Sequence, residues 1–338
     1  MNGLYRLALL SVLGVCMAQA VELPKFLRGE NNRQLQNLLP SPVAIATLVT
    51  GLTDLTELGH SLETLVHAKR YPSSEYVQAP VIMFYDTNSA NLGQGQTSAF
   101  AAAISDQQRE LILVPVSFGN QEDFPAGFIL NPSKDYTYEQ SQRFLISQMW
   151  KHEALNGYET IMRISDDSCL SIDSPTLPNV VSALDVSGEI LFQCPAVPYA
   201  YEIARKYSLG LYDFALNYIS NTIVTSGNAV LNPAMFAQVT KVFAEYRTVP
   251  VLNNHFEVVK MSFITRPDVA AWLDHMTESA PYNVHLNTWG SNEERFITVA
   301  LFATPSEISL VPVPGLMEKD FIAGRTNKSL CRATTATN

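Results

Sequence analysis

Residues 158–168 read YETIMRISDDS, an apolar segment that ends in the adjacent carboxylates Asp166 and Asp167. The part from 158 to 164 has the composition of a buried strand. Open α/β sheets bind their ligands at the carboxyl ends of the strands. We therefore expect this pair, with the hydroxyl of Ser165 beside it, at the ligand-binding edge of a sheet. The alternative is a plain Asp-Asp turn that closes the strand.

Three shorter apolar segments precede this one and fit strands buried on both faces, at 43–49 (VAIATLV), 81–85 (VIMFY) and 111–116 (LILVPV). Segments with helical spacing of apolar residues separate these three strands and the strand at 158–164, at 54–69, 97–104 and 138–155. This alternation predicts an α/β fold, a mostly parallel, Rossmann-like sheet covered by helices. The second half is predicted to be helix-rich, with helices at 200–207, 211–223, 233–246, 266–276 and 294–302.

The composition of the 338 residues excludes several classes of protein. Hydrophobic residues make up 47% and charged residues 16%, which excludes a charge-rich disordered chain. The formal net charge is −10, so the surface repels phosphate backbones and nucleic acid is not an expected partner.

The N-terminus has the features of a secretory signal peptide over residues 1–20. Arg6 supplies the positive charge, residues 7–17 are apolar, and Ala18-Gln19-Ala20 fits a cleavage site. The alternative is a short anchor that is retained, in which case the protein associates with a membrane. We expect a stem over residues 21–41, one domain over 42–315 and a polar tail over 316–338.

A secretory location allows disulfides and glycans. With Cys16 in the signal, three cysteines remain, and a bond between Cys169 and Cys194 is predicted; the alternative is that all three stay reduced. Asn327 begins a glycosylation sequon in the polar tail.

The carboxylates at 166 and 167 suit a hard divalent cation, because Mg²⁺ and Mn²⁺ prefer oxygen ligands and bridge to phosphate oxygens. Transfer from a nucleotide sugar needs such a cation to neutralise the departing diphosphate. The sequence contains no phosphate-binding loop of the GxxxxGK[ST] type, no HExxH and no GxSxG.

Three further motifs follow one another along the chain. The first runs from Arg143-Phe144 to Asp167, the second is His255-Phe256-Glu257 and the residues that follow it, and the third is Trp289-Gly290. Together they resemble the fungal Golgi alpha-1,2-mannosyltransferase (glycolipid 2-alpha-mannosyltransferase) family. The segment 46–65 also resembles the opening of that family, so the resemblance covers most of the chain beyond the signal.

The resemblance implies a type A glycosyltransferase fold, GDP-mannose or another nucleotide sugar as donor, Mn²⁺ (or Mg²⁺) as cofactor, and retention of anomeric configuration. Two positions depart from the family pattern. Ser165 replaces a Glu, and Arg295 stands where the family has a metal-binding His. Glu293 or Glu294 is an alternative ligand, and Arg295 is an alternative partner for the diphosphate.

The same resemblance assigns the roles of individual residues. Asp167 is the expected metal ligand, Asp166 orients the ribose or sugar of the donor beside it, and Glu257 is the catalytic carboxylate near the anomeric carbon. His152 and His255 are interpreted as structural. The residues expected to bind donor or substrate are Thr50, Arg163, Ser165, Trp289, Gly290, Glu293, Glu294 and Arg295.

These observations favour a glycosyltransferase in the lumen of the secretory pathway or secreted from it. Its expected partners are a nucleotide-sugar donor and a glycan or glycoprotein acceptor. A second hypothesis is a secreted protein of the same fold that binds carbohydrate or nucleotide sugar and has lost catalysis. A third, a hydrolase using Asp166, Asp167 and Glu257, lacks a hydrolase signature.

Overall fold

The computed structural model describes residues 43–50, 79–88, 110–166, 168–170, 189–195, 205–252, 254, 256–311 and 316–318. All of them belong to one unit, Pro40–Asn338. The predicted signal peptide, the stem, the helices at 54–69 and 97–104, Asp167, His255 and Asn327 lie outside the described residues.

A seven-stranded sheet in the order β3-β2-β1-β4-β7-β6-β8 organises the domain. Strands β1 (Val43–Val49), β2 (Val81–Asp86), β3 (Leu111–Val116) and β4 (Thr160–Ile164) pair in parallel. All seven residues of β1 are buried, which explains why its sequence is apolar without alternation. The four strands predicted from the sequence are confirmed, and so is the α/β class.

Strand β7 (Phe256–Lys260) runs antiparallel between β4 and β6 (Phe192–Pro195), and β8 (Ile308–Val311) completes the sheet. The sequence analysis missed these strands. In β7 the charged Glu257 interrupts the apolar run and Lys260 ends it, so the segment lacks the pattern of a buried strand. Leu316–Glu318, which was assigned to the tail, forms strand β9 and pairs with β5 (Ser168–Leu170) in a second sheet.

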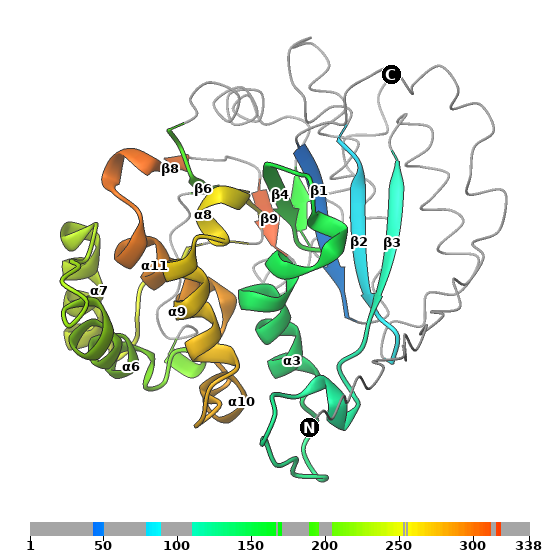
Figure 1. Ribbon diagram of the computed structural model, residues 1–338, viewed down its shortest axis with the longest axis horizontal. Coiled ribbons are helices and arrows are strands. Elements are labelled where there is room, and N and C mark those ends of the chain that lie inside the picture. The colour runs from blue at the N-terminus through cyan, green and yellow to red at the C-terminus, as the bar shows by residue number, and fades with distance from the viewer. Residues whose placement is uncertain are drawn as a thin grey trace, which may run out of the picture. The chain divides into compact units, whose positions relative to one another are not determined.

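Helices cover the sheet and gather beside β6 and β8 (Figure 1). They are α6 (Leu211–Tyr218), α7 (Pro233–Tyr246), α8 (Met261–Ile264), α9 (Pro267–Thr277), α10 (Asn283–Asn287) and α11 (Ser291–Phe302). The predicted helix at 233–246 has the same bounds as α7. Asn232 caps it by accepting a hydrogen bond from the Met235 amide, and Pro233 occupies the first turn.

The segment predicted as one helix at 138–155 changes its winding along its length. Helix α3 (Thr137–Arg143) continues as a π-helical turn over Phe144–Gln148 and a 3₁₀ turn over Met149–Lys151. His152 is extended and ends the run before a second 3₁₀ turn, Glu153–Leu155. Such π-helical turns often mark functional sites.

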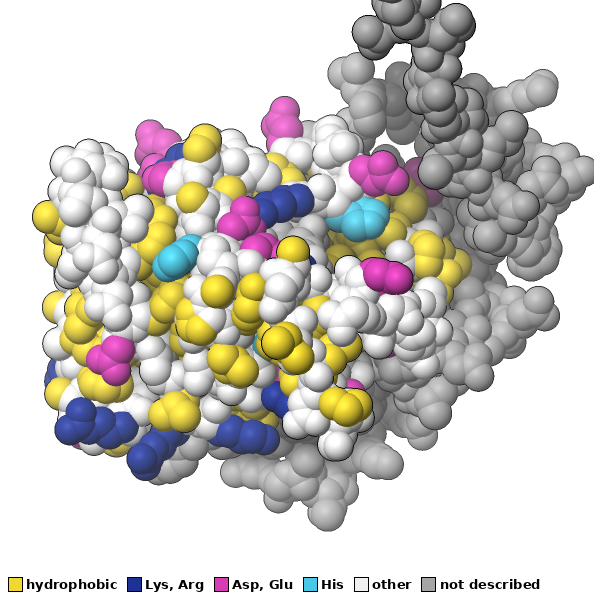
Figure 2. Space-filling model, turned by 60° about the horizontal axis from the view of Figure 1, so that its bottom comes forward, with side chains coloured by type: hydrophobic (Ala, Val, Ile, Leu, Met, Phe, Trp, Pro, Cys, Tyr) yellow, Lys and Arg dark blue, Asp and Glu magenta, His cyan; other side chains and the backbone are white. Residues whose placement is uncertain are grey.

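The core is one cluster of buried side chains between the sheet and these helices. Trp272 and Trp289 are among its largest fully buried members. On the face shown in Figure 2, apolar side chains are dispersed among polar ones. No helix in the described ranges is long and apolar enough to cross a membrane.

Candidate active site

A buried ion pair joins the end of β4 to the start of β7. The strand register places Arg163 opposite Glu257, and Arg163 Nε donates to Glu257 Oε1 at 2.7 Å. The Glu257 side chain is completely buried and that of Arg163 is 5% exposed. From the sequence, Glu257 is expected on a short connection over the carboxyl edge of the sheet. The structure corrects this placement, because the residue lies within a buried strand.

Arg295 of α11 is the second cation on Glu257. Its Nε donates to Glu257 Oε2 at 3.0 Å, so both carboxylate oxygens of Glu257 accept from guanidinium groups. The guanidinium lies over the Trp150 ring, 5.3 Å from its centroid. The two terminal nitrogens of Arg295 make no hydrogen bond, although one of them approaches Glu294 Oε2 at 3.7 Å.

Two further buried carboxyl groups lie in the first turn of α11. Burial raises the pKa of Glu294 to about 7, against the opposing effects of Arg295 and of a hydrogen bond from Thr298. Burial also raises the pKa of Glu293 to about 8. Near neutral pH, both groups are therefore protonated for much of the time, and the charges of Arg163 and Arg295 exceed that of Glu257.

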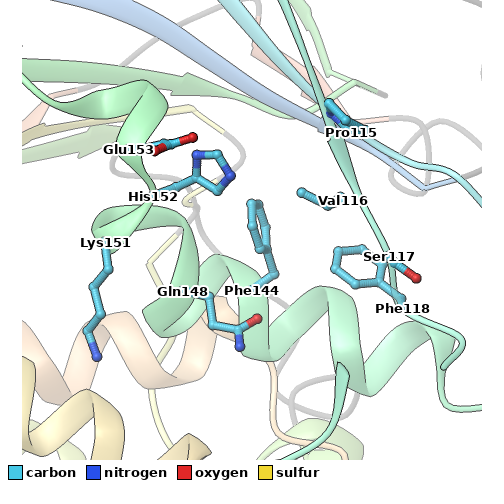
Figure 3. Close-up of a pocket in the computed structure, with 9 residues that line it drawn as sticks. All are labelled: Pro115, Val116, Ser117, Phe118, Phe144, Gln148, Lys151, His152 and Glu153. Carbon is cyan, nitrogen blue, oxygen red and sulfur yellow. The ribbon is translucent and has the colours of Figure 1, made fainter. Parts of the chain in front are cut away.

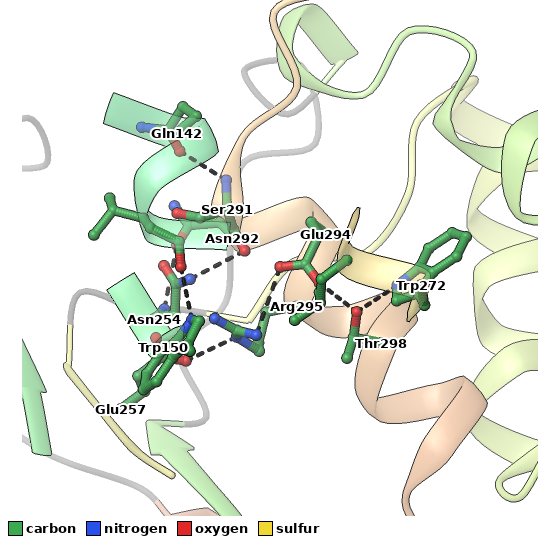
Figure 4. Close-up of polar contacts among 12 residues, drawn as sticks. Gln142, Trp150, Asn254, Glu257, Trp272, Ser291, Asn292, Glu294, Arg295 and Thr298 are labelled. Carbon is green, nitrogen blue, oxygen red and sulfur yellow. Dashed lines mark hydrogen bonds and ion pairs between the residues drawn. The ribbon is translucent and has the colours of Figure 1, made fainter. Parts of the chain in front are cut away.

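Polar contacts tie this cluster to the neighbouring elements (Figure 4). Arg163 also donates to the Asn254 carbonyl. The Asn254 side chain donates to the Ser291 carbonyl at 3.0 Å, and the Ser291 amide donates to Gln142 Oε1 at 2.8 Å. The start of α11 is thereby joined both to α3 and to the loop before β7. The sequence analysis did not identify Asn254 or Gln142, because no motif distinguishes a polar residue that bonds to backbone.

The residues expected to form the site divide into three groups. The structure brings together Arg163, Glu257, Glu294 and Arg295. Asp166 and Ser165 follow β4 and Thr50 follows β1, all three partly buried at the carboxyl ends of their strands. Trp289 does not contact the expected site residues through these groups: its Nε1 donates to the Leu209 carbonyl at 2.7 Å, and its ring packs on Phe214.

Gly290 and Glu293 have a packing role in the structure. Gly290 precedes α11, and a Cβ at this position would collide with the folded-back carboxylate of Glu293. The absence of a side chain at 290 therefore lets Glu293 fold over the start of its own helix. Glu293 Oε1 has no hydrogen-bond partner.

The predicted disulfide between Cys169 and Cys194 is wrong, because Cys194 is a free, buried thiol in the structure. Burial raises the pKa of this thiol well above its ordinary value, so it behaves as a small apolar residue of the core. Cys169 lies on β5, whose side chains are outside the described set. His152 is structural as expected, since its Nδ1 accepts from the Ala154 amide at 3.1 Å.

Of the two carboxylates expected to hold a cation, Asp166 lies within the described residues. Asp166 has the oxygen donors that Mn²⁺ or Mg²⁺ prefers, but no group of three or more His, Cys, Asp or Glu within the described ranges is arranged to hold a metal. Arg295, at the position of the family's His, carries no lone pair for a metal. A cation here would therefore depend on Asp166 and Asp167.

No protein-family model and no curated protein sequence matches the chain. Its fold resembles that of core-mannan synthase A from Aspergillus fumigatus in a form with Mn and GDP, with a TM-score of 0.58 and 14% identity over 79% of this chain and 72% of that one. It also resembles the mannosyltransferase Ktr4p from S. cerevisiae, with a TM-score of 0.58 and 14% identity over 79% of this chain and 67% of that one. For Ktr4p in complex with GDP the TM-score is 0.59, again at 14% identity, over 82% and 71%. The chain therefore has the type A glycosyltransferase fold of these mannosyltransferases.

Proposed function

We propose that this protein is a glycosyltransferase of the secretory pathway, a retaining mannosyltransferase that uses GDP-mannose or a related nucleotide sugar. The observation that carries the proposal is the fold, which agrees with two fungal mannosyltransferases over about four fifths of the chain. The proposed acceptor is a glycan or a glycoprotein. The protein would act in the lumen or after secretion, at a membrane only if its N-terminal segment is retained.

The placement of Asp166 supports this proposal. It follows β4 at the carboxyl edge of the parallel strands, where α/β folds bind ligands. Asp166 and Asp167 are the residues that would hold Mn²⁺ or Mg²⁺, and the cation would supply positive charge for the leaving diphosphate. Thr50 at the end of β1 belongs to the same edge and is the proposed contact of the nucleoside.

Glu257 acts in this proposal as a positioning residue. A carboxylate whose two oxygens accept from Arg163 and Arg295 has little nucleophilic character and lies away from solvent. It instead holds two guanidinium groups near the end of β4. Positive charge in this buried setting favours the anion that forms as the bond between the sugar and the diphosphate breaks.

The contacts of Glu257 with the two arginines also favour a second candidate function, a protein of this fold that binds nucleotide sugar or carbohydrate without transfer. Glu257 is not free to contact the sugar, and Arg295 stands at a position where the related family has a metal ligand. The two candidates agree on ligand binding and differ on turnover.

The test measures binding and transfer on the same preparation. Calorimetry with GDP and UDP, with and without Mn²⁺, establishes the nucleotide, and release of GDP from GDP-mannose in the presence of a mannoside acceptor measures transfer. We expect GDP to bind more tightly with Mn²⁺ and mannose to be transferred. Binding without transfer would favour the second candidate, and no binding of either nucleotide would contradict both.

A further inference from the structure

The connection between β3 and α3 leaves the sheet at its carboxyl edge, the edge that also carries Asp166. The start of this connection is fixed to the strands, because the Phe118 amide donates to Asp86 Oδ1 at 3.2 Å. Figure 3 shows this start, where Phe118 lies across a pocket of about 560 Å³ from Gln148. The rest of the connection, residues 124–136, contains neither helix nor strand, and we call it the flap.

The flap lies beside α10 and has few attachments to the domain (Figure 1). Within the described part of the chain, its backbone hydrogen bonds join residues no more than four apart. Tyr282 Oη donates to the Ala126 carbonyl at 2.7 Å, and Lys134 Nζ donates to the His285 carbonyl at 3.1 Å. Gly127 has a φ of +87°, and a Cβ there would lie 2.8 Å from the Tyr282 hydroxyl. A segment held by so few bonds can open locally while the domain stays folded.

A cluster of rings around His285 of α10 also attaches the flap. The ring centroids of Phe124, Phe128 and Tyr136 lie 5.5, 4.7 and 6.5 Å from that of the imidazole. Phe124 and Phe128 are buried, and His285 has no exposed surface. Within the residues that the structure describes, neither ring nitrogen of His285 has a hydrogen-bond partner. An imidazolium needs acceptors for two N–H groups, so the closed flap favours the neutral ring.

The charged groups around His285 also oppose a positive charge on its ring. Lys134 of the flap and Arg143 of α3 are the cations that act on it. Each has a carboxylate partner, Glu139 for Lys134 at 2.8 Å and Glu278 for Arg143 at 2.5 Å. Burial, together with the two cations, lowers the pKa of His285 from 6.5 to about 4. In an open flap, contact with water would return this pKa to its ordinary value.

We propose that the flap is an acid-sensitive closure, which neutral His285 holds against α10 and which opens more often as the pH falls from 7 to 5. Protonation takes place in the open state, where water solvates the imidazolium, so acid shifts the equilibrium toward that state. The closed flap has its full stability above about pH 6.5 and loses it as the pH falls toward 4.

The two pKa values of His285 set the size of this effect. They imply that the population of the open flap rises about 20-fold between pH 7 and pH 5. Glu293 and Glu294 lie on α11, outside the flap, so their titration does not enter this local equilibrium. The inference does not depend on the proposed transferase activity.

Hydrogen exchange of the full-length protein tests the proposal, with rates converted to protection factors so that the intrinsic effect of pH is removed. In the wild type, protection of flap amides such as that of Phe128 should fall about 20-fold from pH 7 to pH 5. His285→Phe keeps a ring in the cluster but has no proton to gain, so its protection should be equal at the two pH values. The matched control is His275→Phe on α9, an exposed histidine that also stacks on an aromatic ring, and it should behave as the wild type does.

Tyr282→Phe separates the strength of the closure from its pH dependence. Loss of the hydroxyl that donates to Ala126 should lower protection about fivefold at both pH values, and the fall from pH 7 to pH 5 should remain. Direct titration of the His285 ring by NMR should give a midpoint well below 6.5, and this measurement decides the question if His285→Phe does not fold. Three results would overturn the proposal: equal protection of the wild-type flap at pH 7 and pH 5, the same fall in His285→Phe as in the wild type, or a His285 midpoint near 6.5.

Discussion

The Glu257 carboxylate forms ion pairs with two guanidinium groups. Arg163 Nε lies 2.7 Å from Glu257 Oε1, and Arg295 Nε lies 3.0 Å from Glu257 Oε2. Glu257→Gln would leave both cations buried without their anion, and breaking one side of a buried ion pair is strongly destabilising. We expect the free energy of unfolding to fall by about 3 kcal/mol or more. Urea denaturation measures this change, with Glu159→Gln at an exposed position as the control. A variant as stable as the wild type would show that Glu257 does not hold the arginines.

Glu293 and Glu294 make stability depend on pH. Their pKa values in the folded protein, about 8 and about 7, lie above the ordinary value of 4.5, so the folded state binds protons more tightly than the unfolded state. The resulting stabilisation is full below about pH 4.5 and is lost as the pH rises through 7 and 8. We expect the free energy of unfolding to decrease from pH 5 to pH 8.

Glu293→Gln should reduce this slope, because the amide has no proton to lose, whereas Glu245→Gln on exposed α7 should keep it. Urea denaturation at several pH values provides the comparison. Equal slopes in the wild type and in Glu293→Gln would contradict the assignment of the effect to this buried carboxyl group.

Among the elements, α7 shows how local signals define a helix. Asn232 Oδ1 accepts from the Met235 amide at 3.0 Å, which satisfies one of the free amides of the first turn. Asn232→Ala should therefore lower the free energy of unfolding by about 1 kcal/mol, and Asn232→Asp should restore most of it. Thermal and urea denaturation measure both effects. If Asn232→Asp is as destabilised as Asn232→Ala, the loss does not come from the cap.

For the whole molecule, ligand binding should appear as added stability, because a ligand that binds only the folded state raises the melting temperature. GDP with Mn²⁺ should raise it more than GDP alone. Asp167→Ala should remove the difference made by Mn²⁺ and leave the effect of GDP alone, whereas Asp213→Ala at an exposed position should change neither. A full response to Mn²⁺ in Asp167→Ala would show that this carboxylate does not hold the cation.

The sequence by itself determined the four parallel strands, the α/β class and helix α7, because continuous apolar runs, helical spacing and a capped start are local properties of the chain. It also placed Asp166 directly after β4. Tertiary structure alone decided the surroundings of Glu257. Its strand carries two charged residues, and only the pairing of β7 with β4 and the approach of α11 bring Arg163 and Arg295 to its two oxygens. The pocket beside Gln148 has the same origin, since it joins the end of β3 to a helical turn about thirty residues later in the chain. Contacts between segments far apart in sequence leave no periodic signal, so they become visible only when the fold brings those segments together.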